Sequence, residues 1–247
     1  PRYFIQLSFK GTHFHGWQSQ NNAITVQSEL EKALQTILNE SIKTTGAGRT
    51  DTGVHARFYI AHFDTNHPLA LDKAQFLYKM NAVIHPDIAL NDIFPVNTES
   101  HARYSALSRT YTYYISKVKD PFNAEFSWYY SVPLNLEIMN EAAAVIKKHS
   151  DFTSFSKLHS NVNNNICTVK EAFWTDRGNT IDFSISANRF LRNMVRSLVG
   201  TMVEIGRGKI DVAALNSIFE GRDRRLAGYS APACGLFLTH ICYTYIS

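Results

Sequence analysis

The sequence predicts an α+β protein built from two related halves. Segments with strand-type alternation and many aromatic side chains are interspersed with segments of helical periodicity. Residues 1–105 follow the order strand–helix–strand–strand–helix–strand, and residues 106–247 follow a variation of it. No linker rich in Pro, Gly or Ser separates the halves. We therefore expect one continuous, mainly antiparallel sheet with helices on one side and a cleft on the other.

In the first half, the order of elements is the split arrangement of ferredoxin-like and RNA-recognition domains. A strand is expected over residues 2–9, and a helix begins near Thr25, with Thr25, Ser28 and Glu29 as capping groups. Strands at 41–45 and 55–63 flank a glycine-rich loop, and a further strand covers 88–96. A second helix covers 71–83, and its predicted apolar side consists of Leu71, Ala74, Leu77, Tyr78 and Val83.

The second half begins with a strand at 109–116 and a short strand near 128–130. A helix at 136–148, a turn at 151–155 and strands at 166–175 and 180–187 follow. A long helix is expected to begin near Arg189, followed by a short helix at 212–219 and a final strand at 235–245. The polar, Asn-rich residues 160–165 are expected to be mobile.

Composition restricts the functional classes. The chain has 247 residues, a formal net charge of +4 and a pI of about 8.9, a mild basic bias that permits a nucleic-acid partner. It has no apolar run long enough to cross a bilayer and no secretory leader, so a cytoplasmic protein without membrane contact is expected. Cys167, Cys234 and Cys242 lack metal-type spacing, and their odd number argues against a disulfide framework. His13 and His15 have no third ligand at a useful spacing, so no metal is expected.

The glycine-rich loop is the most informative stretch. Gly46, Gly48 and Gly53 lie within eight residues, with Arg49 and Asp51 between the last two. A phosphate-binding loop would continue with Lys-Ser/Thr into a helix, and a dinucleotide-binding loop would also open a helix, whereas this loop leads into a strand. Two interpretations remain: a hairpin tip in which Asp51 caps the turn, or a rigid tip that presents Asp51 for chemistry.

The predicted long helix carries positive charge. Arg189, Arg192 and Arg196 are spaced three and four apart, so they would share one helix face. Arg196 lies close to the apolar edge, where a guanidinium needs a carboxylate unless it snorkels to solvent. Residues 189–225 contain eight Lys or Arg and four Asp or Glu, a net charge of +4, which indicates a surface that faces nucleic acid.

Tyr111 lies on a predicted strand of the second half. It could stack on a nucleobase at an open sheet face or simply pack in the core. Arg103 and Arg109 add positive charge nearby. If Asp51 points into a cleft between the halves, Arg196 would favour its ionised form, and the carboxylate could act as nucleophile or base. Arg49 could then fill the gap left by an extruded nucleotide or hold its phosphate.

Motifs along almost the whole chain resemble the tRNA pseudouridine synthases of the A type. The resemblance is carried by residues 9–18, 25–27 and 30–31, by the loop at 48–56, by 102–106 and 109–113, and by 151–155, 190–200 and 235–238.

The resemblance implies roles for single residues. Asp51 would be the catalytic aspartate, Arg196 its ion-pair partner and Tyr111 the aromatic residue packed against the target base. Arg49 would assist nucleotide flipping, and Leu236 would line the base pocket. The basic residues Arg103, Arg109, Arg189 and Arg192 would contact RNA. The family isomerises uridines at positions 38–40 of the tRNA anticodon stem-loop, acts as a homodimer and needs no cofactor.

Two rival functions can be weighed from the residues. A non-catalytic RNA-binding protein could use the basic groove and Tyr111, but an Asp facing RNA phosphates would repel them, which favours an enzyme. A phosphate-transfer enzyme would need a loop lysine and a metal site. The residues do not decide whether Asp51 adds to the sugar, adds to the base or removes the 2′ proton.

Overall fold

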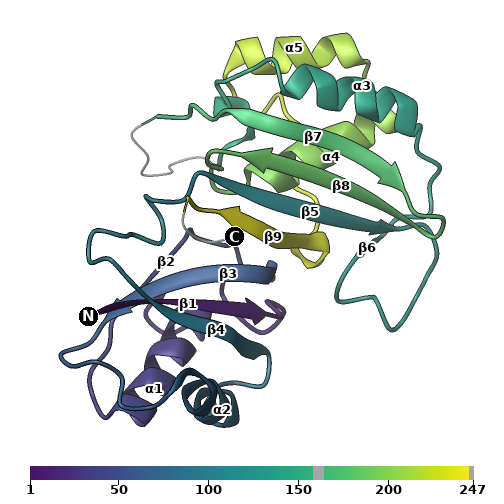
Figure 1. Ribbon diagram of the computed structural model, residues 1–247. Coiled ribbons are helices and arrows are strands. Elements are labelled where there is room, and N and C mark those ends of the chain that lie inside the picture. Colours follow the sequence, from purple (N-terminus) through teal and green to yellow (C-terminus); the bar gives the residue numbers. More distant parts are fainter. Residues whose placement is uncertain (158–163, 245–247) are drawn as a thin grey trace. The chain divides into compact units, whose positions relative to one another are not determined.

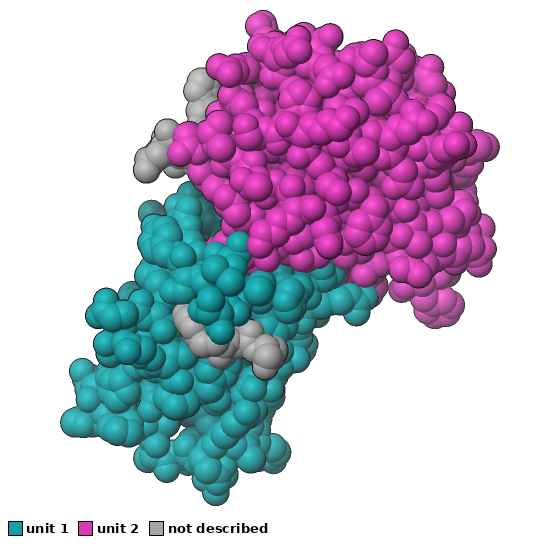
Figure 2. Space-filling model, turned by 45° about the horizontal axis from the view of Figure 1, so that its top comes forward, with its two compact units in different colours: residues 1–107, 238–247 teal, residues 108–237 magenta. Residues whose placement is uncertain are grey.

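The computed structural model describes residues 1–157 and 164–244 and divides into two compact units. Unit 1 consists of residues 1–107 together with the C-terminal residues from 238, and unit 2 of residues 108–237 (Figure 2). The described residues form mainly antiparallel strands and five α-helices, so the predicted α+β class is confirmed. Most of the Asn-rich stretch 160–165 lies outside the described residues.

Unit 1 has the predicted strand–helix–strand–strand–helix–strand order. Its elements are β1 (Arg2–Phe9), α1 (Val26–Leu38), β2 (Thr44–Gly46), β3 (His55–Asp64), α2 (Lys73–Val83) and β4 (Ile88–Val96). β1 pairs antiparallel with β3 and β4, and β2 pairs antiparallel with β3. Strand β9 (Leu236–Cys242), whose last five residues belong to this unit, follows β3 in the sheet. Figure 1 shows α1 and α2 on the same face of these strands.

The start of α1 follows the predicted capping chemistry. Thr25 Oγ1 accepts a hydrogen bond from the Ser28 backbone N–H (3.2 Å), and Ser28 Oγ accepts one from the Thr25 N–H (3.1 Å). This reciprocal pair satisfies two backbone donors that the first helical turn leaves without a partner. The helix ends at Asn39, which adopts a left-handed conformation with φ of 52°.

The predicted apolar side of α2 is wrong. The buried residues of this helix are Phe76 and Met80, whereas Tyr78 is 78% exposed and Val83 48% exposed. The sequence of α2 contains two overlapping apolar rows. Phe76 and Met80 are one turn apart, and this row is the one that packs beneath the sheet.

Unit 2 contains the remaining elements. They are β5 (Ser108–Ser116), β6 (Trp128–Tyr129), α3 (Leu136–Ile146), the 3₁₀ turn η1 (Thr153–Phe155), β7 (Val169–Asp176), β8 (Thr180–Ala187), α4 (Met194–Gly206), α5 (Val212–Gly221) and the 3₁₀ turn η2 (Ala233–Gly235). β8 pairs antiparallel with β5 and β7, and β6 pairs parallel with β5. The three helices cover one face of these strands (Figure 1).

The long helix begins later than predicted. α4 starts at Met194, and Asn193 before it is left-handed, with φ of 67°. Arg189 and Arg192 therefore precede the helix and do not share a helix face with Arg196. The apolar residues Phe190 and Leu191 extend the helical periodicity backwards in the sequence, whereas the backbone turns at Asn193. Asn tolerates this conformation better than most residues.

Candidate active site

The glycine loop lies in unit 1 between β2 and β3, and the segment that follows β1 braces it. A side chain at Gly11 would overlap the carbonyl of Val54, and one at Gly16 would overlap that of Thr50. The Gly53 N–H donates to the Phe14 carbonyl (3.3 Å), and the Trp17 N–H donates to Thr50 Oγ1 (3.0 Å). Residues 11–17 and 47–54 thus form one packed structure, in which glycines permit the close backbone approach.

Two aromatic side chains form the floor of the loop. The rings of Trp17 and Tyr59 are stacked, with centroids 4.3 Å apart. Gly46 lies directly against both, so a side chain there would overlap them. The Tyr59 hydroxyl donates to the Gly48 carbonyl, and the Ala47 N–H donates to the Ile60 carbonyl (2.8 Å). The loop is therefore rigid, with its entry fixed by packing and hydrogen bonds. Sequence reasoning did not assign these roles to Trp17 and Tyr59, although the glycines around them were a signal of close packing.

Asp51 is half-buried at the tip of this loop. Its backbone carbonyl accepts a hydrogen bond from the Val54 N–H (3.2 Å), which closes a turn. Gly53 within this turn has φ of +78°, a conformation that favours glycine. The turn geometry is thus specified by backbone bonds and by a glycine, and it places Asp51 on a braced tip.

A pocket beside the loop brings together Arg49, the predicted nucleotide-flipping residue, and Arg103, a predicted RNA-contacting residue. Arg49 and Arg103, both exposed, line this pocket of unit 1 with Trp17, Gln18 and Thr45. Its lining residues include no Asp or Glu. Guanidinium groups bind anions such as phosphate, and two of them lie at this pocket together with Gln27 and Thr44.

The segment that carries Arg103 is anchored by a buried histidine. His62 Nδ1 accepts a hydrogen bond from the Ala102 N–H (3.1 Å), and the Tyr243 hydroxyl donates to the Ala102 carbonyl (2.5 Å). Burial, together with the charges of Arg2 and His101, lowers the pKa of His62 to about 4, against a smaller opposing effect of Asp64. His62 is therefore neutral near pH 7 and can accept the bond. This anchor could not be predicted from the sequence, because His62 lies within a largely apolar strand.

Tyr111 lies on β5 in unit 2, opposite Ile185 of β8. It is half-buried and meets Phe190 edge-to-face, with ring centroids 5.1 Å apart. Tyr113, two residues along the same strand, is fully buried, and its hydroxyl donates to the Pro232 carbonyl (2.8 Å). Burial raises the pKa of the Tyr113 phenol far above its usual range. Of these two tyrosines, Tyr113 is part of the core and Tyr111 retains exposed ring surface.

Arg196 lies in the first turn of α4 and is half-buried. Its Nε donates to the Ala231 carbonyl (2.7 Å), and the Ala231 N–H donates to the Arg196 carbonyl (3.0 Å). This reciprocal pair ties the start of α4 to the segment that leads into β9. Leu236 follows that segment as the first residue of β9, and it is buried.

The predicted RNA-contacting residues of unit 2 lie on two segments, β5 and the connection between β8 and α4. Arg109 on β5 donates from Nη1 to the Asn188 carbonyl (2.9 Å). Arg189 Nη1 donates to Asn164 Oδ1 (3.1 Å), and Arg192 is exposed just before α4. The guanidinium groups of Arg109 and Arg189 thus each donate a hydrogen bond to an asparagine of the same unit, Asn188 and Asn164 respectively.

Within residues 1–157 and 164–244, no three His, Cys, Asp or Glu side chains are grouped so that they could hold a metal ion. No helix in the described part of the chain is long and apolar enough to cross a membrane. The three cysteines are free, and burial raises the pKa of the Cys167 thiol to about 11.

Comparison with known proteins identifies the family. A family model described as tRNA pseudouridine synthase matches residues 6–105 and 149–244. A protein named tRNA pseudouridine synthase A from Bacteroides fragilis is 48% identical over 244 residues, which cover 98% of this chain and 96% of that protein. The protein of the same name from Parabacteroides distasonis is 46% identical over 242 residues, 98% of this chain and 96% of its own. One from a Thermoanaerobacter species is 39% identical over 241 residues, 97% of this chain and 98% of its own. The chain therefore belongs to the tRNA pseudouridine synthase family, which is a family of isomerases.

Proposed function

We propose that this enzyme isomerises uridine to pseudouridine at positions 38–40 of the tRNA anticodon stem-loop, with Asp51 as the catalytic carboxylate. The observation that carries the proposal is the rigid glycine loop. It holds Asp51 at its tip beside a pocket lined by Arg49 and Arg103. A carboxylate that reacts at one atom of an RNA chain must be held in a fixed position, and the rigid loop holds Asp51 in this way.

The reaction needs little besides a well-placed carboxylate. Uracil leaves C1′ of the ribose through N1, rotates and reattaches through C5, so no water or external group is consumed. A carboxylate could assist by adding to the sugar, by adding to the base or by removing the 2′ proton. Each of these routes requires the carboxylate to be held in position, and we propose no cofactor.

The arginines beside Asp51 fit the task of exposing the base. Taking a nucleotide out of its stack costs a few kcal/mol, roughly. Arg49 is two residues from Asp51 on the same loop, and we infer that it fills the gap left by the base or holds its phosphate. Arg103 reaches the same pocket from another segment and would hold a neighbouring phosphate.

We also propose roles for residues of unit 2. Tyr111 would stack on the extruded uracil, an interaction worth roughly 1–3 kcal/mol per base. Arg196 would pair with Asp51; its bond to Ala231 uses Nε, and a guanidinium has further N–H donors on its terminal nitrogens. Leu236 would line the base pocket, and Arg109, Arg189 and Arg192 would contact the RNA backbone.

The remaining proposals concern the whole protein. We infer a cytoplasmic homodimer in which residues 1–105 supply the Asp51 loop and residues 106–247 supply Tyr111 and Arg196. Light scattering of the free enzyme tests the dimer, because a monomer of 28.0 kDa at working concentration would contradict it.

Tritium release tests the proposed reaction. With tRNA tritiated at uracil C5, the wild type should release tritium, because C5 loses its hydrogen when it bonds to C1′. Asp51→Ala and Asp51→Asn should bind tRNA but lose turnover. Glu99→Gln removes an exposed carboxylate of the same unit and should keep the wild-type rate.

The outcomes separate the proposal from its rival. Normal release by either Asp51 variant would remove Asp51 from the mechanism. No release by any protein, with tRNA still bound, would favour a non-catalytic RNA-binding protein in which the glycine loop is a recognition tip.

A further inference from the structure

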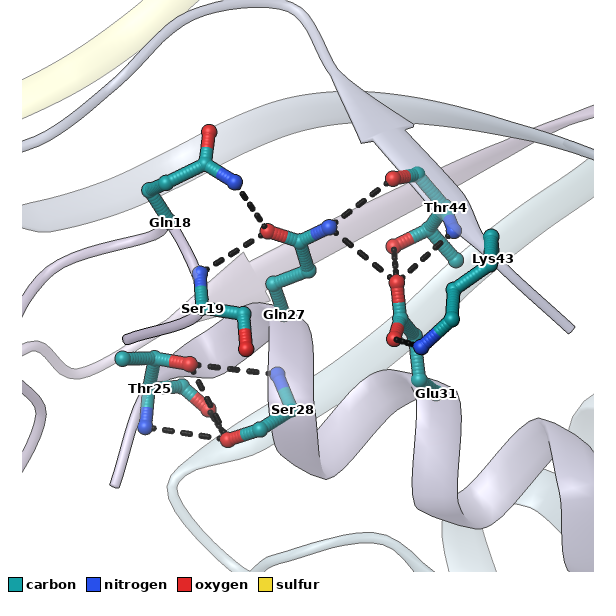
Figure 3. Close-up of polar contacts among 8 residues, drawn as sticks. All are labelled: Gln18, Ser19, Thr25, Gln27, Ser28, Glu31, Lys43 and Thr44. Atoms are coloured by element: carbon teal, nitrogen blue, oxygen red, sulfur yellow. Dashed lines mark hydrogen bonds and ion pairs between the residues drawn. The ribbon is translucent and has the colours of Figure 1, made fainter. Parts of the chain in front are cut away.

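Helix α1 turns two polar side chains, Gln27 and Glu31, toward β2 and the segment after Gly16 (Figure 3). They lie one helical turn apart. Gln27 is 8% exposed, and the side chain of Glu31 is 13% exposed. Polar groups buried to this extent need hydrogen-bond partners, so the contacts of both side chains are informative.

The Gln27 side chain uses its full hydrogen-bonding capacity within the protein. Its Oε1 accepts bonds from Gln18 Nε2 (3.0 Å) and the Ser19 N–H (2.9 Å). Its Nε2 donates to the Thr44 carbonyl (2.9 Å) and to Glu31 Oε1 (3.1 Å). An amide side chain has two donors and two acceptor positions, and all four are occupied here. Gln27 also lines the pocket of Arg49 and Arg103, but all the polar groups of its side chain are engaged within the protein.

Glu31 holds the first residue of β2. Its Oε1 accepts hydrogen bonds from the Thr44 N–H (2.9 Å) and from Thr44 Oγ1 (3.2 Å), in addition to the one from Gln27. Its Oε2 pairs with Lys43 Nζ (3.2 Å), a lysine whose side chain is 86% exposed. Thr44 is thus paired with β3 through the sheet and with α1 through two side chains.

Two connections lead from α1 to the Asp51 loop, one through the Gln27 and Glu31 side chains and one through the backbone N–H of Gln27. The first runs through β2, which is three residues long and ends at Gly46, where the loop begins. The second runs through Trp17: its carbonyl accepts a hydrogen bond from the Gln27 N–H (3.1 Å), and its N–H donates to Thr50 Oγ1 (3.0 Å). The entry of the loop and the residue before Asp51 are both tied to α1.

We propose that Gln27 and Glu31 are positioning residues of the active site, which act through the hydrogen bonds that hold the Asp51 loop in its reactive place. This inference rests on the proposed function of Asp51. Displacing a reacting group by about 1 Å can cost on the order of a hundredfold in rate. Loss of the network should therefore lower turnover, while the groups that bind tRNA remain.

The test replaces Gln27 by Met, which keeps the length of the side chain and removes its four hydrogen bonds. Turnover of saturating tRNA by Gln27→Met should fall about tenfold or more, and the dissociation constant for tRNA should change less than about threefold. Amide hydrogen exchange of residues 44–54, followed by mass spectrometry, should become faster. All assays are run well below the unfolding temperature of each protein.

Ser28→Ala is the matched control. It removes the capping box of the same helix, in which Ser28 Oγ bonds the Thr25 N–H (3.1 Å), and it leaves every contact of Gln27 and Glu31 in place. This variant should lose thermal stability yet keep wild-type turnover and wild-type exchange of residues 44–54. It separates the network's effect on the loop from a general weakening of α1.

Glu31→Gln provides a second variant of the same size, should Gln27→Met fold poorly. An amide at this position must turn an NH₂ group toward either the Thr44 N–H or Lys43, so it cannot keep all the bonds of the carboxylate. We expect lower turnover and faster loop exchange here also.

The proposal is overturned if the folded variants exchange residues 44–54 at the wild-type rate, or if their turnover equals that of Ser28→Ala. If the wild type itself does not isomerise tRNA uridine, the proposed function fails. The exchange rates then decide alone whether Gln27 and Glu31 hold the loop.

Discussion

At the scale of single residues, the geometry of the Asp51 loop depends on positions where a side chain does not fit. Gly46 lies against the Trp17 ring and the Tyr59 hydroxyl, and Gly16 against the Thr50 carbonyl. Gly48 belongs to the same loop, but a methyl group there would meet no atom within 4 Å. The glycines of the loop therefore differ in what they contribute.

This difference gives a matched pair of substitutions. Gly46→Ala should destabilise the protein by about 1–3 kcal/mol, because the added methyl group must displace the stacked Trp17 and Tyr59. Gly48→Ala should stay within about 0.5 kcal/mol of the wild type, since its surroundings are open. Urea unfolding followed by tryptophan fluorescence measures both values. Equal free energies of unfolding for the two variants would show that Trp17 and Tyr59 move aside for the methyl group without loss of stability.

At the scale of elements, α4 and the segment before β9 depend on each other through Arg196 and Ala231. Ala231 is buried, and its carbonyl accepts a hydrogen bond from the guanidinium of Arg196. Arg192, by contrast, is exposed and precedes the helix. Arg192 and Arg196 are four residues apart, but only Arg196 lies within α4, where it links the helix to Ala231.

We predict that Arg196→Met lowers both stability and turnover. The loss of a hydrogen bond from a charged donor should cost about 1.5–3 kcal/mol, and the proposed partner of Asp51 would be missing. Arg192→Met should unfold at the wild-type temperature. Thermal unfolding and tritium release are measured on both variants; unchanged unfolding and turnover in Arg196→Met would rule out the proposed ion pair.

The success of prediction from the sequence also varied by element. Helix α1 and strand β8 were predicted well, because a capping box, a single apolar stripe and alternating residues are local signals. The start of α4 and the buried face of α2 were predicted wrongly. The backbone turn at Asn193 and the choice between two apolar rows depend on packing that a local pattern does not contain.

The same reasoning applies to the site. The glycine loop could be singled out because glycines, Arg and Asp in that order form a specific motif, and the catalytic role of Asp51 stays a prediction. The supports of the loop were not identified: Trp17, Tyr59, Gln27 and Glu31 come from three separate segments. Their roles arise from contacts between residues distant in the chain, such as that of Glu31 with Thr44. Such pairings cannot be read from the spacing of one segment.

At the scale of the whole molecule, two features stand out: the two separate segments that form unit 1, and the positive charge carried by both units. Residues 238–244 belong to the same unit as residues 1–107, so this unit combines two segments that are distant in the sequence. The formal net charge of +4 equals the net charge of residues 189–225, which lie in unit 2. The arginine-lined pocket adds two guanidinium groups in unit 1. Both units therefore offer positive charge to a polyanion.

The salt dependence of tRNA binding measures how many of these charges contact phosphates. The logarithm of the binding constant falls with the logarithm of salt concentration, by about 0.7 per phosphate contact on single strands and about 0.9 on duplexes. Arg103→Gln should reduce this slope by about one contact and weaken binding at low salt. Lys79→Gln, an exposed lysine of α2 outside the pocket, should leave the slope unchanged. Filter binding from low to physiological salt gives both slopes, and a wild-type slope for Arg103→Gln would show that the pocket does not hold a phosphate through this arginine.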